Sequence, residues 1–332
     1  MMKKMKKLLV LCAAAMVVFT GCGEKKEESA SNKSAENATL NIAYQYGLGH
    51  VPAVIAKEKG FIEEAYKDAT GKELTINWNQ MSSGADINTG IASGSLQAGF
   101  MGAGPAISGV TKDVGYKIFT NITNQEHCLM TNDESITSLG DLIGSEHQIA
   151  LVNIGSIQHI ILAKALYNAG YDPHALDSNL VAMAHPDGMS ALESGSVACH
   201  LTSSPYIYME RANKDLHEIQ EITEALTVDN TFNVGVASEE LYNNNKELYQ
   251  ALCDGVQAAI DYINNNMEEV AKLTYELDGN SLEDELEYLQ KGRYTAETSG
   301  IFELAVFMAD NDFIDKKPES YSDLVFDNVT GD

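Results

Sequence analysis

Alternating apolar and polar positions mark the start of the folded part of the chain. The alternation over Thr39–Tyr44 predicts a strand. Apolar residues at helical spacing over Val51–Lys59, followed by Gly60, predict a helix with a glycine end. The same patterns predict further strands at 73–78 and 97–100 and a helix at 85–93. Strands that alternate with helices in this way predict a parallel sheet with helices on both faces.

A run of small residues follows the third of these strands. It lies within Ala92–Ala106, and Gly102–Pro105 is predicted to be a turn that presents backbone rather than side chains. Open α/β sheets place their binding crevice at such strand ends, where backbone N–H groups can face an anion. We therefore expect Gly102 and Gly104 to lie at a ligand site. A tight strand-to-helix connection is the alternative interpretation.

The second half of the chain repeats this architecture. The strand predicted at 147–151 leads to a Gly-Ser corner, and Ser156 occupies the position of a helix N-cap. Strands are also predicted at 181–184, 197–202 and 231–238, and helices at 189–195, 246–265, 267–275 and 282–292. The last strand would return the chain to its first half.

These elements predict an α/β fold with two lobes, a ligand cleft between them and a helical C-terminal region. With 332 residues and 44% apolar content, the chain can bury a sizeable core. We assign residues 39–129 and 232–332 to lobe I and residues 130–231 to lobe II. In a doubly wound fold, the loops after the strands gather at the crevice.

The candidate ligand-binding residues all lie in loops that follow predicted strands, and they offer hydroxyl, amide, imidazole or backbone groups. Several such neutral donors together can hold a desolvated polar or anionic group. The candidates are Tyr46, His50, Ser82, Ser83, Gly102, Gly104, Asn124, Asn153, Ser156, His185, Ser203, Ser204 and Tyr206. Structural roles stay open for some of them: His50 could simply begin a helix, Ser82 and Ser83 could cap one, and Tyr206 could pack across a hinge.

The net charge of the chain limits the classes of partner that it can bind. The chain has 48 acidic and 22 basic residues, a net charge of −26, and its only arginines are Arg211 and Arg293. Nucleic-acid binding requires a basic surface, which this composition does not offer. An anionic ligand would have to be bound by helix N-termini and neutral donors instead of an arginine cluster.

The N-terminus has the pattern of an export signal. Four lysines precede an apolar run at residues 8–19, which is short for a membrane span. The run ends in Phe19-Thr20-Gly21-Cys22, which resembles a bacterial lipoprotein signal. We expect a signal peptide at residues 1–21, a lipid on Cys22 and a flexible tether at 22–38, which places the protein on the extracytoplasmic face of the cell membrane. An ordinary secretion signal is the alternative.

Motifs for catalysis or metal binding are missing from the sequence. It contains no Gly-x-Ser-x-Gly elbow, no P-loop and no His-Glu-x-x-His. Cys128, Cys199 and Cys253 are isolated, which supports neither a disulfide framework nor a metal site. We expect a binding protein that uses no metal and no cofactor.

Several short motifs together resemble one family. They are Tyr44-Gln45, Ala56-Lys57-Glu58-Lys59-Gly60-Phe61, Gly94-Ser95-Leu96-Gln97-Ala98-Gly99, Gly102-Ala103-Gly104-Pro105 and Ser138-Leu139-Gly140-Asp141-Leu142-Ile143-Gly144. The chain is similar to the solute-binding lipoproteins of ABC importers for nitrate, sulfonates, taurine and thiamine-precursor pyrimidines, the NMT1/THI5-like family. The resemblance implies a periplasmic-binding-protein fold that closes on a small ligand and docks on a permease with its ATPase.

The resemblance leaves the ligand open. A sulfonate, taurine-like compound or nitrate is the main expectation. A thiamine-precursor pyrimidine is the alternative, which Tyr46 and His50 would suit. Where the family often has Trp-Glu-Pro, this chain has Ser203-Ser204-Pro205-Tyr206, which favours a ligand that accepts hydrogen bonds from hydroxyls. The related pyrimidine synthases are enzymes, but their cysteine-rich iron motif has no counterpart here.

Overall fold

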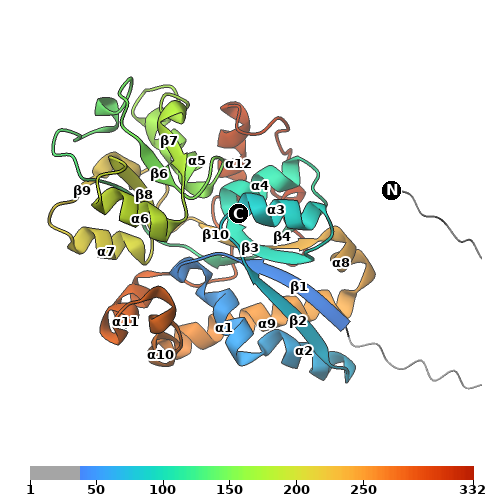
Figure 1. Cartoon of the computed structure of the whole chain (residues 1–332). Helices are drawn as coiled ribbons and strands as arrows, with labels where there is room; N and C mark the ends of the chain where they lie inside the picture. Colours follow the sequence, from blue (N-terminus) through green and yellow to red (C-terminus); the bar gives the residue numbers. More distant parts are fainter. Residues whose placement is uncertain (1–37) are drawn as a thin grey trace, which may run out of the picture. The chain divides into compact units, whose positions relative to one another are not determined.

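A computed structural model of the protein describes residues 38–332 (Figure 1). The expected signal peptide, the lipid on Cys22 and the tether up to residue 37 lie outside the described residues. Ala38 belongs to the first strand, so this strand begins one residue earlier than predicted. Within residues 38–332, no helix has both the length and the apolar character that crossing a membrane requires.

The first sheet has the strand order β2-β1-β3-β10-β4. Its strands are β1 Ala38–Tyr44, β2 Leu74–Gln80, β3 Ala98–Gly102, β4 Tyr116–Thr123 and β10 Asn233–Ser238. The predicted all-parallel sheet is wrong for β10, which runs antiparallel to β3 and β4. The chain returns from the second sheet at the end of β3, where Ala103 N–H donates to Phe232 O at 2.9 Å, so β10 has to run backwards.

The second sheet has the order β7-β6-β8-β5-β9. Its strands are β5 His127–Thr131, β6 Ile149–Leu151, β7 Leu180–Ala182, β8 Cys199–Ser203 and β9 His217–Ile219. β6 is parallel to β7 and β8, whereas β5 is antiparallel to β8 and β9. This sheet is therefore also mixed rather than parallel. The lobe boundary predicted between residues 129 and 130 falls inside β5, a strand that pairs only within this sheet.

Helices cover the sheets. Those of the first half are α1 Val51–Lys59, α2 Phe61–Thr70, α3 Gly84–Ala92 and α4 Ala103–Thr111. The second sheet carries α5 Ile157–Asn168, α6 His185–Glu193 and α7 Tyr206–Ala212. The C-terminal region adds α8 Glu239–Asn244, α9 Lys246–Asn265, α10 Met267–Asp278, α11 Leu282–Lys291 and α12 Ile301–Asp310. The 3-10 turns are η1 Leu48–His50, η2 Leu139–Asp141, η3 Asp177–Asn179, η4 Gln220–Ile222 and η5 Tyr321–Asp323.

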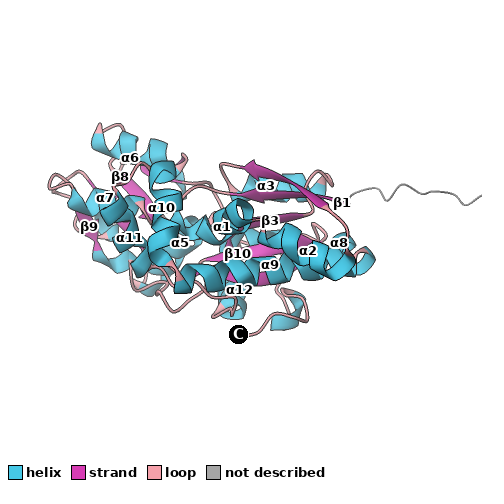
Figure 2. Ribbon diagram, turned by 90° about the horizontal axis from the view of Figure 1, so that it is seen from below, coloured by secondary structure: helices cyan, strands magenta, loops and turns pink. Residues whose placement is uncertain are grey.

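Local sequence signals account for the best-predicted helices. The bounds of α1 and α9 are confirmed, and α1 ends at Gly60 in the left-handed conformation (φ 69°) that glycine adopts without strain. Helix α2 was not predicted, and it packs with α1 against α9, as Figure 2 shows. These three helices cover one face of the first sheet through an apolar cluster that includes Ile42, Ile55, Ile62 and Leu252.

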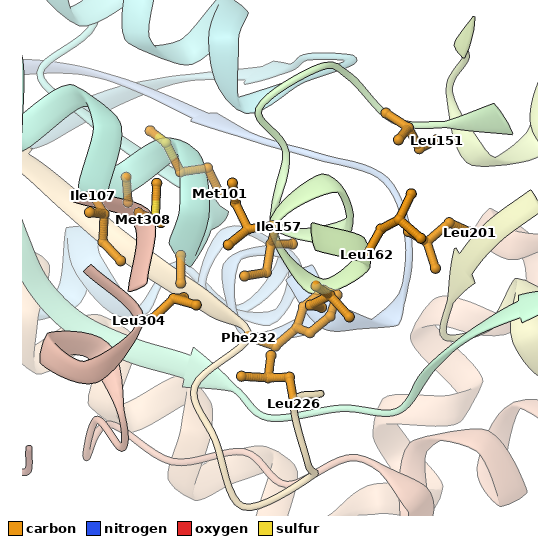
Figure 3. Close-up of a cluster of buried hydrophobic side chains, with 14 of the residues drawn as sticks. Met101, Ile107, Leu151, Ile157, Leu162, Leu201, Leu226, Phe232, Leu304 and Met308 are labelled. Carbon is orange, nitrogen blue, oxygen red and sulfur yellow. The ribbon is translucent and has the colours of Figure 1, made fainter. Parts of the chain in front are cut away.

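A second apolar cluster extends across both sheets. Figure 3 shows Met101, Ile107 and Met308 on the side of the first sheet and Leu162 and Leu201 on the side of the second. Ile157, the first residue of α5, lies between these groups. The shared core therefore brings the start of α5 close to the start of α4, and this approach shapes the candidate site.

Candidate ligand-binding site

A small cavity lies where the strand ends of the two sheets face each other. Its volume is about 40 Å³, and residues from both sheets line it. At about 10–15 Å³ per water molecule, this space holds about three waters. The cavity therefore matches a compact polar group in size.

Eight predicted site residues line this cavity. They are Tyr46, His50, Ser82, Gly102, Ser156, His185, Ser203 and Ser204. As expected for a switch-point crevice, most of them follow the carboxyl ends of strands. The other lining residues, which sequence reasoning did not select, are Gln45, Gly49, Gly84, Pro105, Gln125, Val152, Ile157, Gln158, Ala184, Phe232 and Asn233.

Some of the unselected residues had a usable signal and others did not. Gln45 directly follows a predicted strand, and Gln158 lies two residues after the predicted N-cap Ser156. Phe232 and Asn233 reach the cavity because β10 is antiparallel and begins, rather than ends, at this edge. No local pattern gave the direction of β10.

Five predicted residues do not line the cavity, and three of them have clear structural roles. The Ser83 hydroxyl caps α3 by accepting from Asp86 N–H at 3.2 Å. Asn124 is buried and accepts from Asn121 Nδ2 at 2.9 Å, while its own Nδ2 donates to Asp229 O at 3.2 Å. A Cβ on Gly104 would lie 3.2 Å from the backbone of Ile157.

The remaining two lie beside the cavity. Asn153 lines a neighbouring depression of about 140 Å³ that shares Ser156 with the cavity. Tyr206 stacks on His185, with ring centroids 5.5 Å apart. Tyr206 therefore supports a cavity-lining side chain from behind.

The expected small-residue turn at Gly102–Pro105 does not exist as a separate element. β3 continues through Gly102, and α4 begins at Ala103. A Cβ on Gly102 would lie only 2.7 Å from Ile157 Cγ2. The glycine therefore allows the starts of α4 and α5 to approach closely, because any larger residue would push Ile157 away.

Four helix N-termini meet at the cavity. The lining includes Gly84, the first residue of α3, and the N-cap residues Gly102 of α4, Ser156 of α5 and Ala184 of α6. Each helix has nine or more residues. Unpaired N–H groups and the helix dipole make each N-terminus partly positive. Ser156 is a confirmed N-cap, because its hydroxyl accepts from His159 N–H at 3.3 Å.

The described residues place no charged side chain on the cavity wall. Among residues 38–332, no Asp, Glu, Lys or Arg lines it. His50 is buried, and burial together with the nearby His185 lowers the pKa of His50 to about 3. Its Nδ1 has no hydrogen-bond partner within the described part of the chain. Burial, and to a smaller extent the neighbouring His200, hold the pKa of His185 well below its usual value. Both imidazoles are therefore neutral at pH 7.

A hydrogen-bonded chain extends from the cavity into the second sheet. His185 Nε2 lies 3.0 Å from Gln158 Nε2 and 3.2 Å from Ser203 Oγ. Its Nδ1 lies 3.1 Å from His200 Nε2, and His200 Nδ1 lies 2.6 Å from Glu210 Oε1. Burial lowers the pKa of His200 to about 3 and, with Glu193 adding to it, raises the pKa of Glu210 to about 9.

Metal-ligand clusters are not found in residues 38–332, where no group of three or more His, Cys, Asp or Glu is placed to hold an ion. Cys128, Cys199 and Cys253 are free thiols.

Comparison with solved structures defines the class of protein. The chain is similar to the alkanesulfonate-binding protein SsuA from Xanthomonas axonopodis pv. citri, whose structure contains MOPS: the TM-score is 0.73 at 16% identity, over 88% of this chain and 99% of that one. A likeness at this identity shows the fold. This is the two-lobe α/β fold of periplasmic binding proteins, as the sequence predicted.

Sequence comparison places the chain within that class. It is 27% identical over 209 residues to a putative aliphatic sulfonates-binding protein of Bacillus subtilis, covering 62% of this chain and 59% of that relative. It is 23% identical over 309 residues to the taurine-binding periplasmic protein of Escherichia coli, covering 86% and 91%. Residues 33–275 match the NMT1-like family, and the chain belongs to it.

Proposed function

We propose that this protein is the extracytoplasmic solute receptor of an ABC importer and that it captures a small polar or anionic organic ligand of the sulfonate, taurine or nitrate type. One observation carries the proposal: four helix N-termini converge on a cavity that no acidic residue of the described part, 38–332, lines. Such N-termini form a ready-made anion site. The two sequence relatives are an aliphatic sulfonates-binding and a taurine-binding protein, which supports the same ligand class.

The donors in this site are neutral. Ser156, Ser203 and Ser204 contribute hydroxyls, and Gln158 contributes an amide. Hydrogen bonds to an ionised acceptor are about twice as strong as neutral ones, so several neutral donors can replace an arginine. The oxygens of a sulfonate or nitrate would accept hydrogen bonds from these donors and from the backbone N–H groups of α5 and α6.

Lobe movement is the proposed mechanism. The cavity of about 40 Å³ is lined by residues from both sheets, so separation of the sheets would widen the path by which a ligand enters. The lobes would follow the predicted division, residues 39–129 with 232–332 and residues 130–231, except that the first boundary lies before β5. The segments before β5 and before β10 link them. Because a ligand contacts both lobes only when they are closed, binding would shift the population to the closed form that docks on the permease and its ATPase.

A thiamine-precursor pyrimidine is the second candidate. The unpartnered Nδ1 of the buried His50 favours it, because a buried polar atom normally has a hydrogen-bond partner, and a heterocycle could supply one. Tyr46 also lines the cavity. Binding by a pyrimidine would depend on His50, whereas binding by an oxoanion would depend on Ser156.

We also propose that a lipid on Cys22 anchors the receptor to the extracytoplasmic face of the membrane. The sequence Phe19-Thr20-Gly21-Cys22 supports this proposal. Labelling of expressing bacteria with a radioactive fatty acid should mark the wild-type protein and leave Cys22→Ala unlabelled. Equal labelling of both would contradict the assignment.

Thermal unfolding of the purified protein tests the receptor proposal. The panel contains alkanesulfonates, taurine, nitrate, pyrimidines, amino acids and sugars. A ligand at about 1,000 times its Kd adds about 4 kcal/mol of stability. A shift confined to sulfonates, taurine or nitrate supports the main proposal, and one confined to pyrimidines supports the second. No shift with any compound, together with an empty protein by native mass spectrometry, would contradict both.

A further inference from the structure

Three buried ionisable side chains form a continuous path away from the cavity. His185 lies on α6, His200 on β8 and Glu210 on α7. His200 and Glu210 are fully buried, and neither lines the cavity. A buried Glu–His–His chain has no evident role in holding the lobe together that an apolar cluster would not serve as well, because burying polar groups is costly.

The protonation of Glu210 determines the direction of every hydrogen bond in this chain. A neutral imidazole has one N–H donor and one acceptor nitrogen. A protonated Glu210 donates to His200 Nδ1, so the proton of His200 lies on Nε2 and is donated to His185 Nδ1. The proton of His185 then lies on Nε2, which faces Gln158 and Ser203 at the cavity.

Loss of one proton reverses the direction of the hydrogen bonds that link Glu210, His200 and His185. The Glu210 proton passes to His200 Nδ1, the His200 Nε2 proton passes to His185 Nδ1, and the His185 Nε2 proton leaves through the cavity to solvent. Glu210 becomes a carboxylate, and both imidazoles remain neutral. His185 Nε2 is now an acceptor. In this state the Gln158 NH₂ group, placed 3.0 Å from His185 Nε2, donates to it. In the protonated state a half-turn of the amide presents the Gln158 oxygen instead, which accepts from His185 Nε2–H.

We propose, building on the proposed function, that Glu210 is a positioning residue that sets what His185 offers the ligand. While Glu210 is protonated, His185 Nε2 is a hydrogen-bond donor for an anion. Once Glu210 is ionised, His185 Nε2 is an acceptor that disfavours an anion. The site would then bind anions without a fixed positive charge. Glu210 would act on the ligand only through His200 and His185.

The surroundings favour the donor state at neutral pH. Glu210 is faced by Glu193 from α6 and by Cys128 from β5, and burial and the Glu193 charge raise its pKa to about 9. His185 is faced by the neutral His50 from η1, while Tyr206 stacks on its ring. These groups introduce no cation that would ionise Glu210 early.

Gly188 provides independent geometric support for the chain. It lies in α6, and a Cβ at this position would be 2.7 Å from His200 Nε2, the atom that contacts His185. A glycine here leaves space for the His200 ring to reach His185.

The test compares Glu210→Gln with Glu285→Gln. Glutamine keeps the size of a protonated glutamate and can hydrogen-bond His200, but it has no proton to release. Glu285 is a matched control: it is fully buried on α11, its pKa is raised by burial, and it bonds Thr274 and Asn280. Nitrogen-15 NMR of the histidine rings in the full protein, from about pH 6 to about pH 10, reports the tautomers. Calorimetry with methanesulfonate, which does not titrate in this range, reports affinity.

In the wild type and in Glu285→Gln, His185 and His200 should carry their protons on Nε2 at pH 7 and on Nδ1 above a transition near pH 9. The affinity for methanesulfonate should fall about tenfold per pH unit above that transition. Glu210→Gln should show no transition and a constant affinity. Unchanged wild-type tautomers, or the same transition in Glu210→Gln, would overturn the proposal.

The two proposals can fail separately. Tautomers that reverse as expected in a protein that does not bind methanesulfonate would support the role of Glu210 and contradict a sulfonate ligand. If Glu210→Gln does not fold, Gly188→Ala replaces it, because a displaced His200 should still respond to Glu210 while His185 no longer does. A tautomer reversal that persists at His185 in Gly188→Ala would overturn the proposal that Glu210 acts through His200.

Discussion

Gly102 and Ile157 are in contact across the two halves of the candidate site, and no room for a single methyl group is left between them. A Cβ on Gly102 would lie 2.7 Å from Ile157 Cγ2. The backbone of Gly102 (φ −61°, ψ 151°) suits any residue, so the requirement for glycine is steric and comes entirely from the other lobe. The contact joins the start of α4 to the start of α5, and both residues line the cavity.

We expect Gly102→Ala to weaken ligand binding by making the closed form harder to reach. Overpacking of this kind costs about 1–3 kcal/mol, which corresponds to a loss of about 5–150-fold in affinity. Calorimetry with the ligand found in the thermal panel measures it. The double variant with Ile157→Ala removes the opposing Cγ2 and should recover much of the affinity. A single variant with wild-type affinity would show that this contact does not limit closure.

Ser156→Ala should lower both stability and oxoanion affinity. Loss of the N-cap costs about 1 kcal/mol of stability, and the ligand also loses a hydroxyl donor. Ser281→Ala is the matched control, because Ser281 caps α11 by accepting from Asp284 N–H at 3.1 Å and does not line the cavity. Urea unfolding should give similar losses for both variants, whereas only Ser156→Ala should bind nitrate or methanesulfonate more weakly. Equal affinities in the two variants would argue against an oxoanion at α5.

The buried His50 should make the protein less stable in acid. Its pKa is about 3 in the folded state, far below the ordinary imidazole value of 6.5, so below about pH 6.5 the unfolded chain takes up a proton that the folded chain does not. Stability contributed by the neutral ring is present above pH 6.5 and is lost as pH falls toward 3. One such group lowers the free energy of unfolding by about 2 kcal/mol between about pH 7 and about pH 5.

His50→Gln removes this titration and keeps a polar side chain. Urea unfolding at several pH values should therefore show a shallower acid decline in the variant than in the wild type. His174→Gln is the control, since His174 is more exposed and its pKa is raised rather than lowered, so its removal should not make the acid decline shallower. Parallel stability curves for wild type and His50→Gln would contradict the assignment of a neutral buried His50.

Substitutions at Asn124 and at its neighbour Gln125 should affect different properties, stability at Asn124 and ligand affinity at Gln125. Asn124 holds Asn121 and Asp229 O, so Asn124→Ala should cost about 1–3 kcal/mol of stability and leave affinity unchanged. Gln125 lines the cavity, so Gln125→Ala should reduce affinity with a smaller effect on stability. Unfolding and calorimetry on the same preparations distinguish the two effects. Loss of affinity in Asn124→Ala alone would restore the sequence-based assignment of that residue.

Local patterns in the sequence were sufficient for much of the fold. Apolar spacing and end signals lie within a few residues of one another, which is why the bounds of α1 and α9 and the N-cap at Ser156 could be predicted. Alternating strands and helices also predicted the class of fold and the strand ends that form the cavity. The absence of an arginine cluster indicated that neutral donors would have to hold an anion.

Tertiary structure decided the rest, because those features depend on residues far apart in the chain. The antiparallel direction of β10 brings Asn233 to the cavity, and nothing near residue 233 encodes it. Gly102 meets Ile157 across the two sheets, so its role in close packing rather than in a turn appears only once both are folded. Glu210 is connected to the cavity through His200 and His185, an alignment that packing of α6, β8 and α7 creates. Local sequence determines which segments are buried and where helices begin, whereas the packing of distant segments determines which polar groups meet at the site.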